Sequence, residues 1–138
     1  MSKAKDITTS NYSATIVETS RELTAREKVM YKDTQNASSL LDMAEQAREA
    51  GAKAIIDNIK DYVVIDVHNE KSDDVDYKNY LVIDGDGNKY VTGSQSFWNS
   101  FMDIYNEMKN ESEPWGIQLN LLDSKNYKGK SILTCSLI

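Results

Sequence analysis

The second half of the chain carries strand-type and helix-type patterns in one fixed order. From residue 60 onward, β-branched and aromatic residues recur with the period of two that is typical of strands. A single stretch with helical spacing interrupts these patterns. Three strands are predicted over 60–68, 77–84 and 89–92, then a helix over 94–109, then two more strands over 115–122 and 130–138.

A hairpin signal and a helix cap support this order. The sequence Asp-Gly-Asp-Gly-Asn at 84–88 is typical of a tight turn between strands. Ser94 is placed as the N-cap of the helix, whose apolar residues form one broad face. Three strands, one helix and two strands is the element order of an OB-fold, a small Greek-key barrel. A strand meander that carries one helix is the alternative.

The first half adds a strand and a helix to this barrel. Residues 12–19 are rich in β-branched side chains, and 28–32 either pairs with them or belongs to a short helix over 23–30. A helix is predicted to begin at Ser38 or Ser39 and to stop at Gly51. We therefore expect a mainly β protein with two helices, an OB-fold-like five-stranded Greek-key barrel with an N-terminal strand and helix extension.

Length and composition limit the organisation of the chain. Its 138 residues and 15.6 kDa suit one domain. We expect a flexible lead-in over 1–11 and a single OB-like domain over 12–138, in which 12–58 is the extension and 59–138 the barrel core. No apolar run approaches the length of a membrane span, and the first residues lack the apolar core of a secretory signal. The sequence therefore predicts a cytoplasmic protein without membrane contact.

The charge balance argues against one class of ligand. A net charge of -6 and a pI of about 4.8 argue against a duplex DNA binder, whose affinity comes mainly from neutralised phosphates. A local basic groove remains compatible with this balance. The one cysteine, Cys135, cannot form an internal disulfide and is predicted to be a core residue.

In an OB-fold the ligand contacts the second and third strands and two of the loops. Here these are 69–76, 77–80, 89–92 and 123–129, and the last loop has two lysines around one tyrosine, with Lys130 directly after it. Aromatic rings stack on unpaired bases, and lysines hold the phosphates between them. For Tyr80 and Tyr90, packing in the protein is an equally open interpretation. The predicted DNA-binding set is Tyr77, Lys78, Tyr80, Lys89, Tyr90, Lys125, Asn126, Tyr127, Lys128 and Lys130.

Residues 115–138, WGIQLNLLDSKNYKGKSILTCSLI, resemble the last hairpin of small single-stranded DNA-binding proteins from tailed phages of Gram-positive bacteria. In that family an extended strand, a turn with Ser, Lys and Lys-Gly, and an alternating terminal strand also close the chain. The resemblance leaves 1–51 unexplained. It implies sequence-tolerant binding of single-stranded DNA in phage replication or recombination, beside other replication or recombination proteins, with no catalysis and no cofactor. The 38–50 helix either packs on the barrel or meets a second copy in a homo-oligomer.

A different function follows from the acidic residues. An adaptor or inhibitor that mimics the charge of nucleic acid would bind a basic groove of a host protein. Its contact surface would consist of Glu70, Asp73, Asp74, Asp76, Glu111 and Glu113.

An enzyme is the third option, and the sequence supplies no set of catalytic residues for it. Asp84, Asp86 and Asn88 have the spacing of a calcium loop, but Lys89 stands where that loop needs glycine and Gln95 where it needs glutamate. His68 is the only histidine, which excludes a multi-histidine zinc site. We expect no metal and no cofactor.

Overall fold

A computed structural model describes residues 11–123 and 131–138 of the chain. These residues form eight strands and three helices. The strands are β1 (Tyr12–Thr19), β2 (Ser38–Ser39), β3 (Ala54–Ile56), β4 (Ile59–Asn69), β5 (Asp76–Asp84), β6 (Lys89–Thr92), β7 (Ile117–Asp123) and β8 (Ser131–Leu137). The helices are α2 (Ala25–Lys32), α3 (Leu40–Ala50) and α4 (Gln95–Met108).

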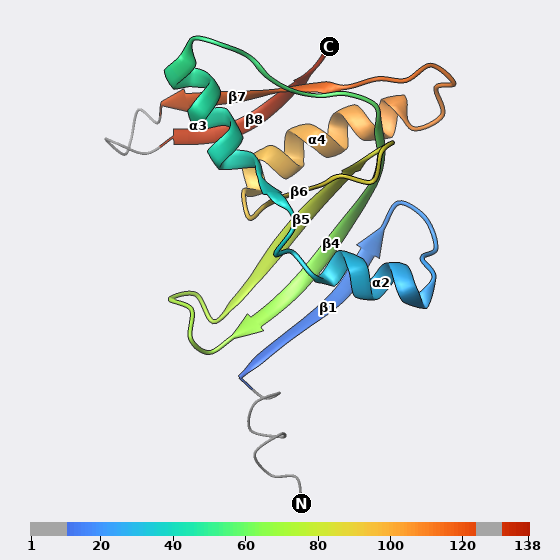
Figure 1. Cartoon of the computed structure of the whole chain (residues 1–138), viewed down its shortest axis with the longest axis vertical. Helices are drawn as coiled ribbons and strands as arrows, with labels where there is room; N and C mark the ends of the chain where they lie inside the picture. Colours follow the sequence, from blue (N-terminus) through green and yellow to red (C-terminus); the bar gives the residue numbers. More distant parts are fainter. Residues whose placement is uncertain (1–10, 124–130) are drawn as a thin grey trace, which may run out of the picture.

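The strands form two sheets, which confirms the mainly β class (Figure 1). The large sheet has the order β1-β4-β5-β6-β2, and the small sheet has the order β3-β7-β8. The long antiparallel pair β4 and β5 extends from the body of the molecule toward one side (Figure 1). The first part of the chain contributes to both sheets, since β1 pairs with β4 and β3 pairs with β7.

The prediction of a five-stranded barrel is wrong. Strands β4, β5 and β6 lie in one sheet and β7 and β8 in the other, and neither sheet closes on itself within the described residues. Helix α4 supplies the physical reason, because its serines bond to the outer edge of β8. The hydroxyl of Ser96 donates to the carbonyl of Leu133 at 2.8 Å, and the N–H of Cys135 donates to the hydroxyl of Ser100 at 3.1 Å. A barrel would need a strand at that edge.

The number of helices also differs from the prediction, which was two. Of the two alternatives that the sequence left open for this segment, the short helix is correct: α2 takes in residues 28–32, and the hairpin partner for β1 does not form. A reciprocal capping box starts α2: the N–H of Glu27 donates to the hydroxyl of Thr24, and the N–H of Thr24 donates to the Glu27 carboxylate. The other caps are as predicted, with Ser39 and Ser94 at the starts of α3 and α4 and Gly51 in the left-handed conformation, φ 67°, after α3.

Strand β4 supplies side chains to the core on both faces of the large sheet. Tyr62 and Val64 face α4, α3 and the small sheet, whereas Val63 and Ile65 face α2. Successive side chains of a strand point to opposite faces. The continuous apolar run in the middle of β4 is therefore the mark of a strand that is covered on both sides.

The 84–88 turn has the predicted hairpin form. The carboxylate of Asp84 accepts hydrogen bonds from the N–H groups of Asp86 and Asn88, from the Asn88 amide and from the Tyr90 hydroxyl. Burial acts to raise the pKa of Asp84, but these hydrogen bonds outweigh it and hold the pKa below its ordinary value. The carboxylate of Asp84 thus stabilises the turn. No group of three or more metal-binding side chains gathers anywhere in 11–123 or 131–138.

Cys135 is buried, as predicted. Burial raises the pKa of its thiol, although the hydrogen bond with Ser100 acts in the opposite direction. A buried thiol with a raised pKa is a packing residue and a poor nucleophile.

Candidate functional site

The inner face of the large sheet changes from apolar to polar along β4 and β5. Val64 pairs with Tyr80 in the aromatic core, and the next pairs on the same face are Asp66 with Lys78 and His68 with Asp76. Helix α4 and the small sheet cover the apolar part. We call residues 65–79, where this inner face of β4 and β5 is uncovered, the arm.

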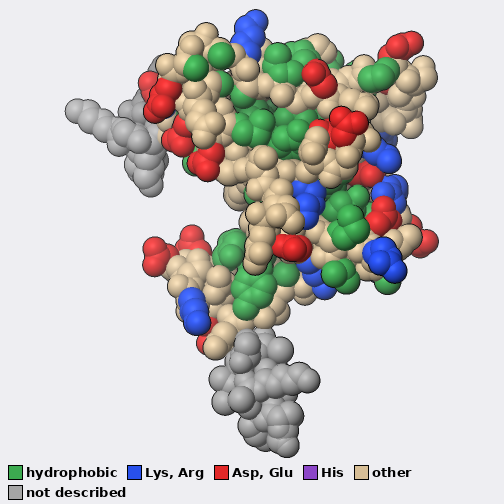
Figure 2. All heavy atoms as spheres, in the orientation of Figure 1, with side chains coloured by type: hydrophobic (Ala, Val, Ile, Leu, Met, Phe, Trp, Pro, Cys, Tyr) green, Lys and Arg blue, Asp and Glu red, His purple; other side chains and the backbone are tan. Residues whose placement is uncertain are grey.

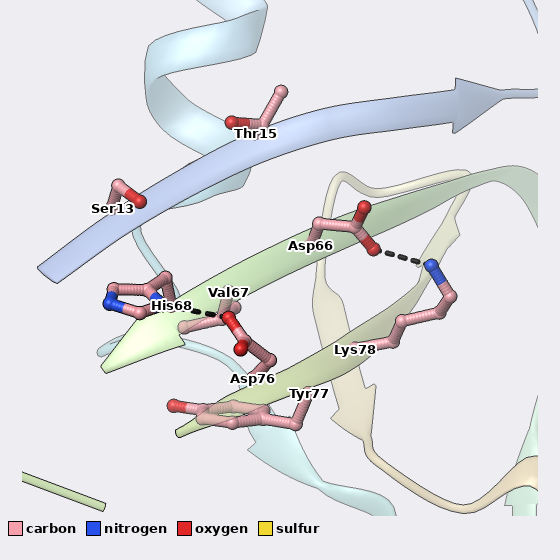
Figure 3. Close-up of a pocket in the computed structure, with 8 residues that line it drawn as sticks. All are labelled: Ser13, Thr15, Asp66, Val67, His68, Asp76, Tyr77 and Lys78. Atoms are coloured by element: carbon pink, nitrogen blue, oxygen red, sulfur yellow. Dashed lines mark hydrogen bonds and ion pairs between the residues drawn. The ribbon is translucent and has the colours of Figure 1, made fainter. Parts of the chain in front are cut away.

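Strand β1 extends this polar surface. Thr15 pairs with Asp66 and Ser13 pairs with His68, so both hydroxyl side chains lie on the same face as their partners. A hollow of about 450 Å³ lies here (Figure 3). Its volume is in the range of about 300–1,000 Å³ that is usual for small-ligand sites. We call its polar lining the polar face, which consists of Ser13, Thr15, Asp66, His68, Asp76 and Lys78.

The molecule is also deeply notched between the arm and the body (Figure 2). Strand β6 pairs only with residues 80–83 of β5, so residues 76–79 of β5 have no strand partner on that side within the described part of the chain. In Figure 1, β5 is the strand of the arm that lies toward the small sheet and α3. The free backbone edge of the arm therefore borders the notch.

Both cations of the polar face are matched by carboxylates. Lys78 forms an ion pair with Asp66, which raises the pKa of Lys78. The Nδ1 atom of His68 lies 2.7 Å from Asp76 Oδ1, and its Nε2 atom lies 3.4 Å from Glu70 Oε2. These two contacts raise the pKa of His68, the one with Asp76 most strongly. The face therefore offers hydrogen-bonding groups without an excess of positive charge.

The structure describes five of the predicted binding residues, and only some of them line the hollow. Tyr77 and Lys78 line the hollow. Tyr80 is 3% exposed, stacks on Trp98 with 4.7 Å between the ring centroids, and donates its hydroxyl hydrogen to Gln95 at 2.6 Å. Of the two interpretations that the sequence left open for Tyr80, packing in the core is therefore correct.

Tyr90 and Lys89 also make hydrogen bonds within the protein. The Tyr90 hydroxyl donates to Asp84 at 2.9 Å, and burial together with this carboxylate raises the pKa of Tyr90 to about 12. The Lys89 ammonium donates to the backbone carbonyls of Met30 and Asp33 at the end of α2, at 2.8 and 2.6 Å. Neither side chain lines the hollow. The other predicted residues, Lys125, Asn126, Tyr127, Lys128 and Lys130, lie outside the described residues.

Four residues of the polar face were missed from the sequence: Ser13, Thr15, Asp66 and His68. The alternation within 60–68 carried a usable signal, because it places Asp66 and His68 on the face of Tyr62 and Val64. No comparable signal existed for β1. Its pairing with β4 joins segments that lie far apart in the sequence.

The acidic residues proposed for an adaptor do not form one surface. Glu70, Asp73, Asp74 and Asp76 lie at or next to the turn of the arm, after β4. Glu111 and Glu113 line a separate hollow with Ile59, at the start of β4. The rise per residue of a strand puts the two ends of β4 about 30 Å apart.

No protein-family model matches the chain, and no curated protein or solved structure matches it either. The molecule itself is a mainly β protein of two sheets with an open polar face on a projecting arm. Among its described helices, none combines the length and the apolar character that crossing a membrane requires.

Proposed function

We propose that this protein binds single-stranded DNA without sequence preference and without catalysis, along the polar face and the adjoining notch. The observation that carries the proposal is the uncovered arm. Strands β1, β4 and β5 continue beyond the aromatic core and present hydroxyl, carboxylate, imidazole and amine groups to an open hollow. The resemblance of 115–138 to phage proteins suggests replication or recombination of phage DNA as the setting, where other proteins of those processes would be partners.

The chemistry of unpaired bases suits such a face. Single-stranded bases expose their pairing edges, which hydrogen-bond with side chains and with free backbone groups. The polar face supplies both donors and acceptors, including the hydroxyls of Ser13 and Thr15 and the ammonium of Lys78. The unpaired edge of β5 over 76–79 adds backbone groups.

Phosphates need cations that the polar face does not have in excess. The segment between β7, which ends at Asp123, and β8, which begins at Ser131, lies outside the described residues. Its sequence includes Lys125, Lys128 and Lys130. We assign phosphate binding to these lysines and base stacking to Tyr127, as single-strand binding generally requires.

The packing of the aromatic residues determines how binding should be measured. Trp98 is 7% exposed and is stacked on Tyr80, so bases cannot reach it without unfolding the core. The other tryptophan, Trp115, is half-buried and lies beside Ile59 at the start of β4, away from the polar face. Intrinsic tryptophan fluorescence is therefore a weak reporter of binding at that face. Fluorescence anisotropy of a dye-labelled oligothymidine at low and at moderate salt reports binding directly, and we expect the affinity to fall as salt rises.

Two charge reversals on the paired strands β4 and β5 make a matched pair for this assay. Lys78→Glu places a second carboxylate beside Asp66 on the polar face and should weaken oligothymidine binding strongly. Lys60→Glu makes the same change of charge at an exposed site at the other end of β4 and should have little effect. The double variant Tyr127→Ala/Lys128→Ala should also weaken binding. An absence of binding at low salt, or equal losses from Lys78→Glu and Lys60→Glu, would rule out the proposal.

The turn of the arm supports a second candidate function, an acidic adaptor that occupies a basic groove of another protein. Asp73 and Asp74 are exposed, and neither forms an ion pair with any of the described residues. Under this function the protein would displace oligothymidine from a basic single-strand-binding protein. The change Asp73→Asn/Asp74→Asn would remove that competition, whereas the DNA-binding function predicts no loss of oligothymidine affinity from it.

A further inference from the structure

Helix α2 has an exposed apolar surface beside positive charges. Val29 is 71% exposed, the highest value among the exposed large hydrophobic residues of the described chain, and Met30 is 53% exposed. Arg26 precedes Val29 and Met30 by three and four residues, and Lys32 follows Val29 by three, so both cations are exposed beside Val29 on the outer side of the helix. We call Arg26, Val29, Met30 and Lys32 the basic patch.

The basic patch is held in place by a well-anchored helix. Tyr31 on the inner side of α2 is buried, and Glu27 is bound by Arg21, with Nη2 and Oε2 2.5 Å apart. Arg21 in turn bonds to the buried Asp61 at 3.0 Å. The exposure of Val29 and Met30 is therefore a property of the folded protein and does not come from a frayed helix end.

Few negative charges lie on or beside the basic patch. Glu27 is already paired with Arg21, and neither Arg26 nor Lys32 forms an ion pair within the described part of the chain. The ammonium of Lys89 adds a cation at the C-terminal end of the helix, where Asp33 is the one adjoining carboxylate. An apolar pair flanked by cations fits an occupant with the opposite charge around an apolar side chain.

The turn of the arm has that arrangement. Residues 70–76, which we call the acidic tip, carry four carboxylates against the single cation of Lys71. Val75 lies among them and is 38% exposed. The turn is ordered by backbone hydrogen bonds from Asn69 N–H to the Val75 carbonyl at 2.7 Å and from Ser72 N–H to the Asn69 carbonyl at 3.0 Å.

We propose that the acidic tip of one copy docks on the basic patch of a second copy of this chain. Asp73 and Asp74 of the tip pair with Arg26 and Lys32 of the patch, and Val75 packs against Val29 and Met30. Within one molecule the tip and α2 lie at separate places (Figure 1), so the tip cannot reach its own patch. Because the two surfaces differ, the contact is head-to-tail, and further copies can add at both ends.

This inference is independent of DNA binding and is tested without DNA. Sedimentation velocity of the full chain over a range of protein concentrations should show association at low ionic strength. The association should weaken at high salt, where exposed charges are screened over about 3–8 Å. A wild-type protein that remains monomeric at low salt and high concentration would overturn the proposal.

Two charge-reversed variants identify the surfaces. Asp73→Lys/Asp74→Lys makes the tip basic, and Arg26→Glu/Lys32→Glu makes the patch acidic, so each variant alone should be monomeric. An equimolar mixture should associate again, because each contact then joins surfaces of opposite charge. Lys60→Glu/Lys109→Glu is the matched control, with the same change of net charge as the patch variant at exposed sites elsewhere, and it should associate like the wild type.

Circular dichroism of each variant establishes that it is folded before its mass is measured. A patch variant that still associates would place the contact on another surface and overturn the proposal. Monomeric variants whose mixture stays monomeric would also overturn it, since the loss would then not come from pairing of these charges.

Discussion

The hydroxyl of Ser100 on α4 accepts a hydrogen bond from the backbone N–H of Cys135 on β8, with 3.1 Å between the nitrogen and the oxygen. The same hydroxyl donates to the carbonyl of Phe97 at 2.9 Å, which fixes its orientation. A helix side chain thus takes the place that a neighbouring strand would take in a barrel. The small sheet stays separate from the large one, and the arm is left uncovered.

Replacing this hydroxyl should destabilise the protein. In Ser100→Ala the buried N–H of Cys135 loses its partner, which costs about 1–3 kcal/mol. Chemical denaturation monitored by circular dichroism measures the change. Asn106→Ala, at an exposed position of the same helix, is the control and should change the free energy of unfolding by less than about 0.5 kcal/mol. Equal stabilities for the two variants would show that the Ser100 bond contributes nothing.

Tyr80 should affect stability rather than binding. Tyr80→Phe removes the hydrogen bond to Gln95 and should cost about 1 kcal/mol, whereas Tyr80→Ala also removes the ring stacked on Trp98 and should cost about 3–5 kcal/mol. Oligothymidine affinity of the folded Tyr80→Phe variant should equal that of the wild type. A Tyr80→Phe variant with unchanged stability and a large loss of oligothymidine affinity would show instead that Tyr80 contacts the ligand.

Local signals predicted most of the elements. The caps at Ser39 and Ser94 and the left-handed glycine at Gly51 are formed by neighbouring residues, and so they could be identified from short segments. Helix α2 was left open against a strand, although its capping box of Thr24 and Glu27 is also local. Its anchoring is not local, because the bond from Arg21 to Asp61 joins parts of the chain that no local pattern connects.

The assembly of the elements could not be predicted in the same way. The closure of a barrel depends on what bonds to the edge of β8 that faces away from β7, and there two serines of α4 take the place of a strand. The role of a tyrosine in a strand depends on what covers that face, and α4 covers Tyr80 but not Lys78 one pair further along. The alternation of β4 placed Asp66 and His68 on one face, but only the pairing with β1 completed the polar face.

His68 should titrate above the ordinary histidine value of about 6.5. Its contacts with Asp76 and Glu70 favour the protonated ring, so its contribution to stability is complete below about pH 6.5 and is lost as the pH rises through the higher pKa of the folded state. NMR titration of the ring protons gives this pKa without ambiguity, because the chain has one histidine. Asp76→Asn should lower the pKa. An unchanged value in that variant would contradict the assigned contact.

Acid should weaken the anchoring of α2. The hydrogen bond from Arg21 lowers the pKa of Glu27 to about 2. A carboxylate whose pKa is lowered in the folded state stabilises the protein at pH values above its unfolded pKa of about 4.3. This stabilisation is lost as the pH falls toward 2. The melting temperature of the wild type should therefore exceed that of Glu27→Gln at pH 7, and the difference should shrink between about pH 4.3 and 2. A difference that does not change with pH would contradict the ionised pair.

The most direct test of the central claim uses His68 as a reporter within the polar face. Its ring resonances should shift or broaden when oligothymidine is added to the full chain, with the same concentration dependence as the anisotropy of the labelled oligonucleotide. The resonances should remain unchanged when duplex DNA is added. Oligothymidine that binds by anisotropy without any change at His68 would place the DNA elsewhere and contradict the account.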